Sequence, residues 1–191
     1  MARAGMTTLI QTVRDYAVIG TGDYTLGTLN YWSDDQIQTV LDKHKLTVHR
    51  EELAPVESYD GGTLVYKEYR SAFGNYEQTT GGTAIFEIED AVGITIGTAS
   101  WSMDYANGIL TFGSNTTGSA YFLNGTSYDV NRAVASIWRM KAGHHAGGVD
   151  FKTDNMSVNR GQLIEHDFDM AEYYDSIGRV NVIGFDRDDT T

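Results

Sequence analysis

The hydrophobic residues of this chain change their spacing twice, and this change constrains the fold more than any other feature. Near both ends, apolar residues recur every three or four positions, which is the pattern of an amphipathic helix. In the middle, Trp101, Met103 and Tyr105 alternate with polar residues, which is the pattern of a half-buried strand. We therefore predict an α+β fold: a small helical bundle with an inserted antiparallel β subdomain and an extended C-terminal tail.

The same pattern divides the chain into parts. Residues 1–50 and 128–178 form the predicted helical bundle core, residues 51–127 form the β-rich insertion, and residues 179–191 form the tail. A chain of 191 residues is long enough for one domain that carries a large insertion.

Four helices are predicted. Ser33 and Gln36 fit a capping box at the start of the second helix, and Lys43 and Lys45 fall in its last turn, where they suit the helix dipole. Asp129 is the expected N-cap of the third helix. The predicted ranges are Thr7–Tyr16, Ser33–Lys45, Asp129–Gly143 and Asn159–Ile177. We expect seven of their side chains to pack in the core: Trp32, Ile37, Leu41, Ile137, Trp138, Phe168 and Tyr174.

Short strands separated by glycine turns are predicted for the insertion. Asn107-Gly108 lies between two strand patterns and predicts a hairpin, because these residues accept the positive φ of a short turn. Residues 20–31 are rich in Gly and Thr and are predicted to form a loop. The strand candidates beside this hairpin are Thr63–Tyr69, Ala84–Glu89, Val92–Ile96 and Ala120–Leu123.

Charge and composition exclude several classes of function. The net charge is −12, and residues 51–127 alone hold ten acidic and two basic residues, so ordinary binding to nucleic acid or to a membrane surface is disfavoured. No cysteine is present, which excludes disulfides, thiolate metal sites and a cysteine nucleophile. No apolar run approaches the ~20 residues of a membrane span and no secretory signal is seen. We therefore expect a protein that is made and assembled in the cytoplasm.

Catalytic and metal-binding patterns are also missing. The sequence has no His-Glu-x-x-His, no Gly-x-Ser-x-Gly and no phosphate-binding Gly-x-x-x-x-Gly-Lys. Residues 186–189 lack the ligand spacing of a calcium loop. We expect no catalytic residue, no cofactor and no metal site, and we expect surface or helix-end positions for His44, His49, His144, His145 and His166. Four carboxylates are assigned to a solvated face of the fourth helix: Glu165, Asp167, Asp169 and Glu172.

Two alternatives of other classes stay open at this point. A hydrolase with paired acids is compatible with the many carboxylates, although no spacing selects a pair. A β-rich carbohydrate-binding module is compatible with the tyrosines of the insertion, although aromatic residues favour strands in any case. The tyrosines concerned are Tyr66, Tyr69, Tyr76 and Tyr105.

The order of short motifs in the second half resembles the head–tail connector, or adaptor, proteins of tailed bacteriophages. In that family a strand reading Gly-aliphatic-x-Phe precedes an alanine-rich helix with a Trp, then a short Asp-Phe segment, then a helix ending in Met-Ala-x-x-Tyr. The start of the predicted second helix, Tyr31–Ile37, is also similar. The matching segments here are Tyr105–Phe112, Ser127–Trp138, Val149–Phe151, Asp154–Ser157, Arg160–Gln162 and His166–Tyr174. The insertion is longer than in the small all-helical members.

The resemblance implies a structural virion protein without catalytic residues or cofactor. Its copies would form a ring, dodecameric in the family, that binds the portal protein and the tail or stopper proteins at the neck of the virion. Double-stranded DNA would pass through the ring without specific binding, and no membrane is involved. We expect the apolar residues of the tail to bind a neighbouring copy or the portal: Val180, Val182, Ile183 and Phe185. The nearer alternative is another neck or tail component, such as a tail-completion or tail-terminator protein.

Overall fold

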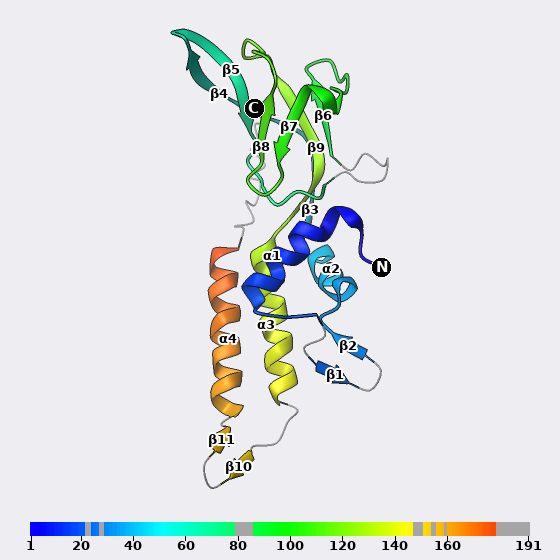
Figure 1. The fold of residues 1–191 in the computed structure, drawn as a ribbon, viewed down its shortest axis with the longest axis vertical. Helices are drawn as coiled ribbons and strands as arrows, with labels where there is room; N and C mark the ends of the chain where they lie inside the picture. The colour runs from blue at the N-terminus through cyan, green and yellow to red at the C-terminus, as the bar shows by residue number, and fades with distance from the viewer. Residues whose placement is uncertain are drawn as a thin grey trace, which may run out of the picture.

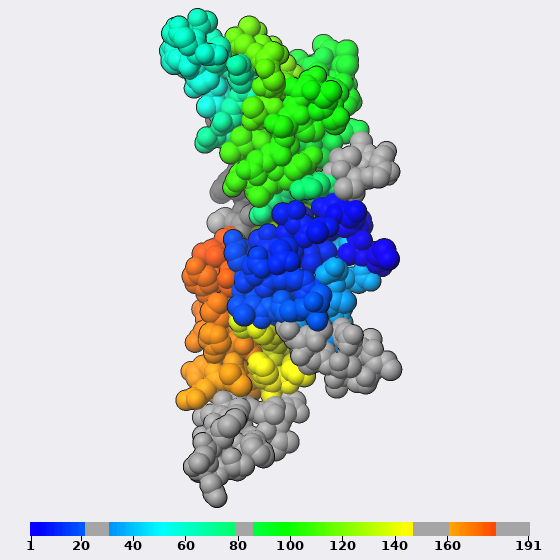
Figure 2. Space-filling view, in the orientation of Figure 1, coloured from blue at the N-terminus to red at the C-terminus, as the bar shows by residue number. Residues whose placement is uncertain are grey.

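The computed structural model describes residues 1–21, 24–26, 29–78, 86–146, 151–153, 156–158 and 160–178. These residues confirm the predicted α+β class. The molecule is elongated, with the helices towards one end and the larger sheets at the other (Figures 1 and 2). The described helices are α1 (Thr7–Ala17), α2 (Asp34–Asp42), α3 (Val130–Ala146) and α4 (Arg160–Ile177). Two short 3-10 turns, η1 (Ala4–Met6) and η2 (Thr98–Ser100), accompany them.

Helix α3 lies at the centre of the helical part, with α4 along one side of it and α2 on the other, while α1 crosses it (Figure 1). Apolar side chains of all four helices meet in one core around α3. The predicted capping box of α2 is confirmed, because the Ser33 hydroxyl accepts a hydrogen bond from the backbone N–H of Gln36, and the Gln36 side-chain oxygen accepts one from the backbone N–H of Ser33. Asp129 is confirmed as the N-cap of α3, since its carboxylate accepts from the Arg132 amide at 3.1 Å.

Five of the seven residues expected in the core are buried, and each is at most 4% exposed. These residues are Trp32, Ile37, Leu41, Ile137 and Trp138. Tyr174 is half-buried against the same core. The seventh residue, Phe168, lies elsewhere and is described with α4 below.

The β part contains two antiparallel sheets whose strand orders are β3-β9-β6 and β4-β5-β8-β7. Side chains of both sheets share a second core, to which Leu123 contributes from one sheet and Leu110 from the other. The β4–β5 hairpin projects beyond the rest of its sheet (Figure 1). The bounds are β3 (Lys45–Glu52), β4 (Ala54–Asp60), β5 (Thr63–Arg70), β6 (Glu87–Asp90), β7 (Trp101–Asp104), β8 (Ile109–Phe112) and β9 (Tyr121–Tyr128). Two small hairpins lie in the helical part: β1 (Tyr24–Leu26) with β2 (Leu29–Tyr31), and β10 (Phe151–Thr153) with β11 (Met156–Val158).

Several expected elements differ from the observed ones. The second helix ends at Asp42, so Lys45 belongs to a strand, because β3 gains backbone partners from β9 that a longer helix would forgo. The boundary at residue 50 therefore falls inside β3. Val92–Ile96 is not a strand: Asp90 accepts hydrogen bonds from the Val92 and Ile94 amides and closes a tight turn there. Part of the loop expected at residues 20–31 is the β1–β2 hairpin.

The other strand predictions hold better. The hairpin at Asn107-Gly108 is confirmed as β7–β8, and only Gly108 of this pair takes a positive φ. Thr63–Tyr69 is confirmed as β5, and Ala120–Leu123 is the start of the longer β9. Ala84–Glu89 corresponds to β6 from Glu87 onward, and residues 84–85 lie outside the described part of the chain.

A hydrogen-bonded network joins the two parts of the molecule at the roots of β3 and β9. The Arg3 guanidinium donates to Glu77 at 2.7 Å and to Asp42 at 2.7 Å. The Tyr128 hydroxyl accepts from Arg3 at 2.9 Å and donates to Glu77 at 2.7 Å. Glu77 is only 3% exposed, so the network satisfies a carboxylate that would otherwise be buried without partners. The N-terminus, α2 and β9 are thereby held together.

His44 follows α2 and contacts Ser136 of α3, and its burial predicts that stability depends on pH. Its Nε2 lies 2.9 Å from the Ser136 hydroxyl, and burial lowers the pKa of the imidazole below its usual value, with Arg132 and Lys43 acting in the same direction and Asp129 and Asp175 against it. As the pH falls through about 6.5, the unfolded chain binds this proton first, so stability decreases. We expect a His44→Gln variant, which keeps a group able to bond to Ser136, to lose less stability between pH 7.5 and pH 5.5 in urea unfolding. An identical loss in the variant and the parent would contradict this expectation.

Candidate functional site

Helix α4 is held on the molecule by a narrow strip of its surface. Along its 18 residues, only Asp167 and Ala171 are buried among the side chains described from 161 onward. The small Ala171 side chain allows close approach to α3. Asp167 was expected on the solvated face, but it is buried because His145 of α3 holds its carboxylate at 2.7 Å.

The end of α4 is fixed by polar and aromatic contacts. The Arg139 guanidinium of α3 pairs with Asp175, and the Asn131 amide donates to the Ile177 carbonyl at 3.2 Å. Tyr174 stacks on Tyr16 of α1, with ring centroids 5.9 Å apart, and its hydroxyl donates to the Tyr16 carbonyl at 3.3 Å. These contacts hold α4 along one side of the helical part (Figure 2).

The prediction that Phe168 packs in the core is wrong, because the side chain is 52% exposed. Successive residues of a helix are about 100° apart, and the buried strip follows Asp167 and Ala171. Phe168 therefore lies one step around the helix from this strip. Of the two α4 residues expected in the core, Tyr174 packs against it and Phe168 does not.

The exposed face of α4 combines apolar and acidic side chains. Four large apolar residues of α4 are each at least 42% exposed: Leu163, Phe168, Tyr173 and Ile177. Glu165, Asp169 and Glu172 are exposed beside them at i, i+4 and i+7, so they share one side of the helix. At about 100° per residue, Phe168 lies on one side of the exposed acids and the other three apolar residues lie on the other side. None of these three acids is in an ion pair with another residue of the described chain. This face therefore carries uncompensated negative charge next to aromatic surface.

A second feature lies on the other side of α3, where α2 and α3 border a groove of about 160 Å³. Trp32 and Val40 are its buried apolar lining, and Met140 of α3 is 46% exposed beside them. Lys43 is the charged residue of the lining, and it is exposed. The remaining lining residues are Tyr31, Gln36 and Thr39. Sequence reasoning missed this groove, because its walls come from segments about 100 residues apart and no local pattern joins them.

The histidines take separate positions rather than one site. His44 bonds to Ser136, His49 lies 2.9 Å from the Asn124 side-chain oxygen, and the His166 ring packs edge-on against Trp138. His144 and His145 are adjacent near the end of α3. Within the described ranges, no three His, Asp or Glu side chains are grouped closely enough to bind a metal ion.

The tyrosines expected for a carbohydrate surface do not lie together on the outside. Tyr69 and Tyr76 are buried in the second core, at 0% and 1% exposure. The Tyr69 hydroxyl donates to the Ser119 carbonyl, and Tyr105 packs edge-on against Phe86. Tyr66 is half-buried on β5. These positions favour sheet packing as the role of the tyrosines.

The predicted partner-binding residues Val180, Val182, Ile183 and Phe185 lie outside the described residues. Of the helices that the structure describes, none combines the length and the apolar character needed to cross a bilayer. Comparison with protein-family models, with curated proteins and with solved structures found no match to this chain.

Proposed function

We propose that this chain is a structural virion protein of a tailed bacteriophage, a head–tail adaptor without catalytic activity. Its copies form a ring between the portal and the tail and extend the DNA channel. The order of motifs from Tyr105–Phe112 to His166–Tyr174 supports this proposal by resemblance. The structural observation that supports it is the set of large apolar side chains that α4 leaves exposed, Phe168 above all, since exposed apolar surface concentrated on one helix is typical of an interface with another protein.

The charge of the molecule suits passage of DNA. The β-rich part has a net charge of −8 over residues 51–127, and a ring with acidic walls repels phosphate groups at short range. DNA then moves through the channel without adhering to it. The exposed carboxylates of this part, such as Glu57 and Asp60 on the projecting hairpin, are the groups that would provide this repulsion.

The C-terminal tail is part of the same proposal. Its apolar residues Val180, Val182, Ile183 and Phe185 would add contacts to a neighbouring copy or to the portal, by pairing with an exposed strand edge. The tail follows Gly178 at the end of α4. Assembly would take place in the host cytoplasm.

The location of the chain in the particle tests this function. We expect a gold-labelled antibody against the protein to mark the junction of head and tail in intact virions seen by electron microscopy. We also expect particles that lack the protein to accumulate as separate heads and tails. Label on the head surface or at the tip of the tail, or no label on any particle, would contradict the proposal. Label along the tail side of the neck alone would favour a tail-completion or terminator protein.

A further inference from the structure

We infer that the exposed face of α4 docks into the α2–α3 groove of a second copy of this chain. This inference rests on the proposed ring and names the surfaces through which its copies meet. The docking segment is defined as Phe168 with its neighbours Glu165 and Glu172, one helical turn away on either side. The receiving site is the groove lined by Trp32, Val40, Lys43 and Met140.

The charges of the two surfaces are complementary. Glu165 and Glu172 have no ionic partner among the described residues. Lys43, at the groove, and Lys45, two residues further along the chain, are exposed and also lack an ion pair within the described chain. On a molecule with a net charge of −12, the exposed Lys43 at an apolar groove, with Lys45 two residues further along the chain, favours an acidic partner.

The apolar parts also match in size. Phe168 is 52% exposed and its ring has no polar atom to keep hydrated. An apolar space of about 150 Å³ can hold a benzene ring, and the groove has a volume of about 160 Å³. Met140 at its edge is unbranched and polarizable, and such a side chain adapts to an incoming aromatic ring.

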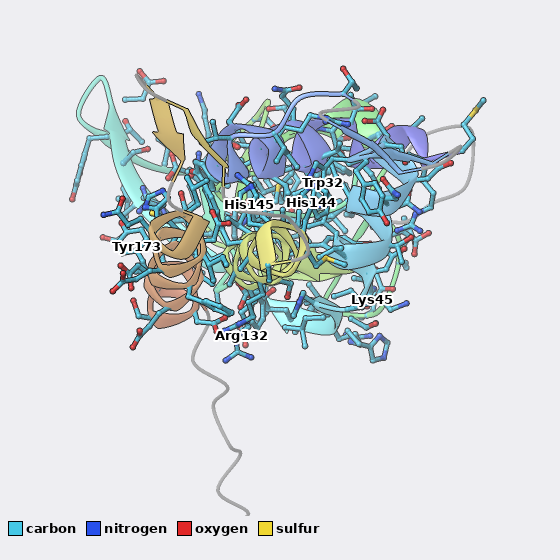
Figure 3. All side chains as sticks on the ribbon, turned by 90° about the horizontal axis from the view of Figure 1, so that it is seen from below. Trp32, Lys45, Arg132, His144, His145 and Tyr173 are labelled. Atoms are coloured by element: carbon cyan, nitrogen blue, oxygen red, sulfur yellow. The ribbon has the colours of Figure 1, made fainter. Side chains whose placement is uncertain are left out.

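The geometry favours a head-to-tail contact over a two-fold one. Helix α4 and helix α2, which borders the groove, lie on opposite sides of α3 (Figures 1 and 3). A contact between different patches on opposite sides repeats from copy to copy and closes into a ring when the rotation allows it. Pairing α4 with α4 would instead place Glu165, Asp169 and Glu172 against the same acids, which like-charge repulsion disfavours.

Charge exchange between two variants tests the contact. The α4 variant carries Glu165→Lys and Glu172→Lys, and the groove variant carries Lys43→Glu and Lys45→Glu. We expect each variant alone to self-associate at least about tenfold more weakly than the parent in sedimentation velocity at low salt. An equimolar mixture of the two restores assembly, because each α4 then meets a groove of opposite charge. Circular dichroism and thermal unfolding establish that both variants fold.

A matched control carries the same change in charge elsewhere. Glu52→Lys with Asp60→Lys alters two exposed acids of the β part, and we expect parental self-association from it. The inference is overturned if the charge exchanges leave self-association unchanged or if the mixture of the two variants fails to restore it. It is also overturned if the α4 variant binds best to the α4 helix of the parent, or if the parent stays monomeric at every concentration up to about 1 mM. Antibody labelling at the neck is independent of these results, so a ring built through other surfaces leaves the proposed function standing.

Discussion

An Arg3→Ala variant is expected to unfold with a free energy about 2–3 kcal/mol lower than that of the parent. The substitution removes the cation that faces Glu77 and Asp42 and leaves Glu77, at 3% exposure, with Tyr128 as a remaining partner. Breaking a fully buried pair costs more, but the Arg3 side chain is 41% exposed and water screens part of the effect. Urea unfolding at neutral pH measures the loss.

The matched control for this substitution is Arg70→Ala. Arg70 pairs with Glu68 on β5, and both side chains are exposed, so we expect a loss within about 0.5 kcal/mol. The decline of the free energy of unfolding at acidic pH gives a second measurement. Arg3 holds the pKa of Asp42 below its usual range, so this stabilisation is complete at neutral pH and disappears as the pH falls below about 4. The Arg3→Ala variant should therefore show a flatter decline in acid, and equal losses for Arg3→Ala and Arg70→Ala would show that the network adds no stability.

A Gly108→Ala variant is expected to lose at least about 3 kcal/mol of stability. Gly108 closes the β7–β8 hairpin with a φ of +69°, a conformation that costs an L-residue about 1–2 kcal/mol. A Cβ at this position would also overlap the carbonyl oxygen of Phe73. Because that oxygen belongs to the backbone, the overlap is relieved only by moving the hairpin away from residues 71–76.

The control Gly62→Ala separates these two effects. Gly62 has a φ of +85° in the β4–β5 turn, and nothing lies within 4 Å of the position its Cβ would take. We therefore expect only the backbone cost of about 1–2 kcal/mol there. Thermal unfolding of the two variants measures the difference. Losses of the same size would mean that the contact with Phe73 contributes nothing.

Local sequence signals predicted local structure well. The capping box at Ser33 depends on residues within one helical turn, and so does the N-cap at Asp129, so both could be found from a short window of sequence. The hairpin at Gly108 follows from the same kind of signal. The end of the second helix could not be found in this way, because Lys45 belongs to β3 through its pairing with Tyr128 of β9, which lies far along the chain.

The candidate site was predicted only in part. The period of α4 was correct, but Phe168 and Asp167 exchange the environments expected of them, since one step around the helix turns a buried position into an exposed one. The burial of Asp167 depends on His145, which lies on another helix. The groove and the Arg3 network depend on contacts between distant segments, which periodicity does not encode.

The paired roots of β3 and β9 have a consequence for how this molecule can vary. Lys45 and Tyr128 are register partners, so the chain enters the β-rich part and returns from it at neighbouring points of one antiparallel strand pair. Turns of the β-rich part that lie far from this strand pair can be lengthened, shortened or exchanged without changing the pairing of β3 with β9. The β4–β5 hairpin can therefore change in length or composition while the helical part keeps its geometry.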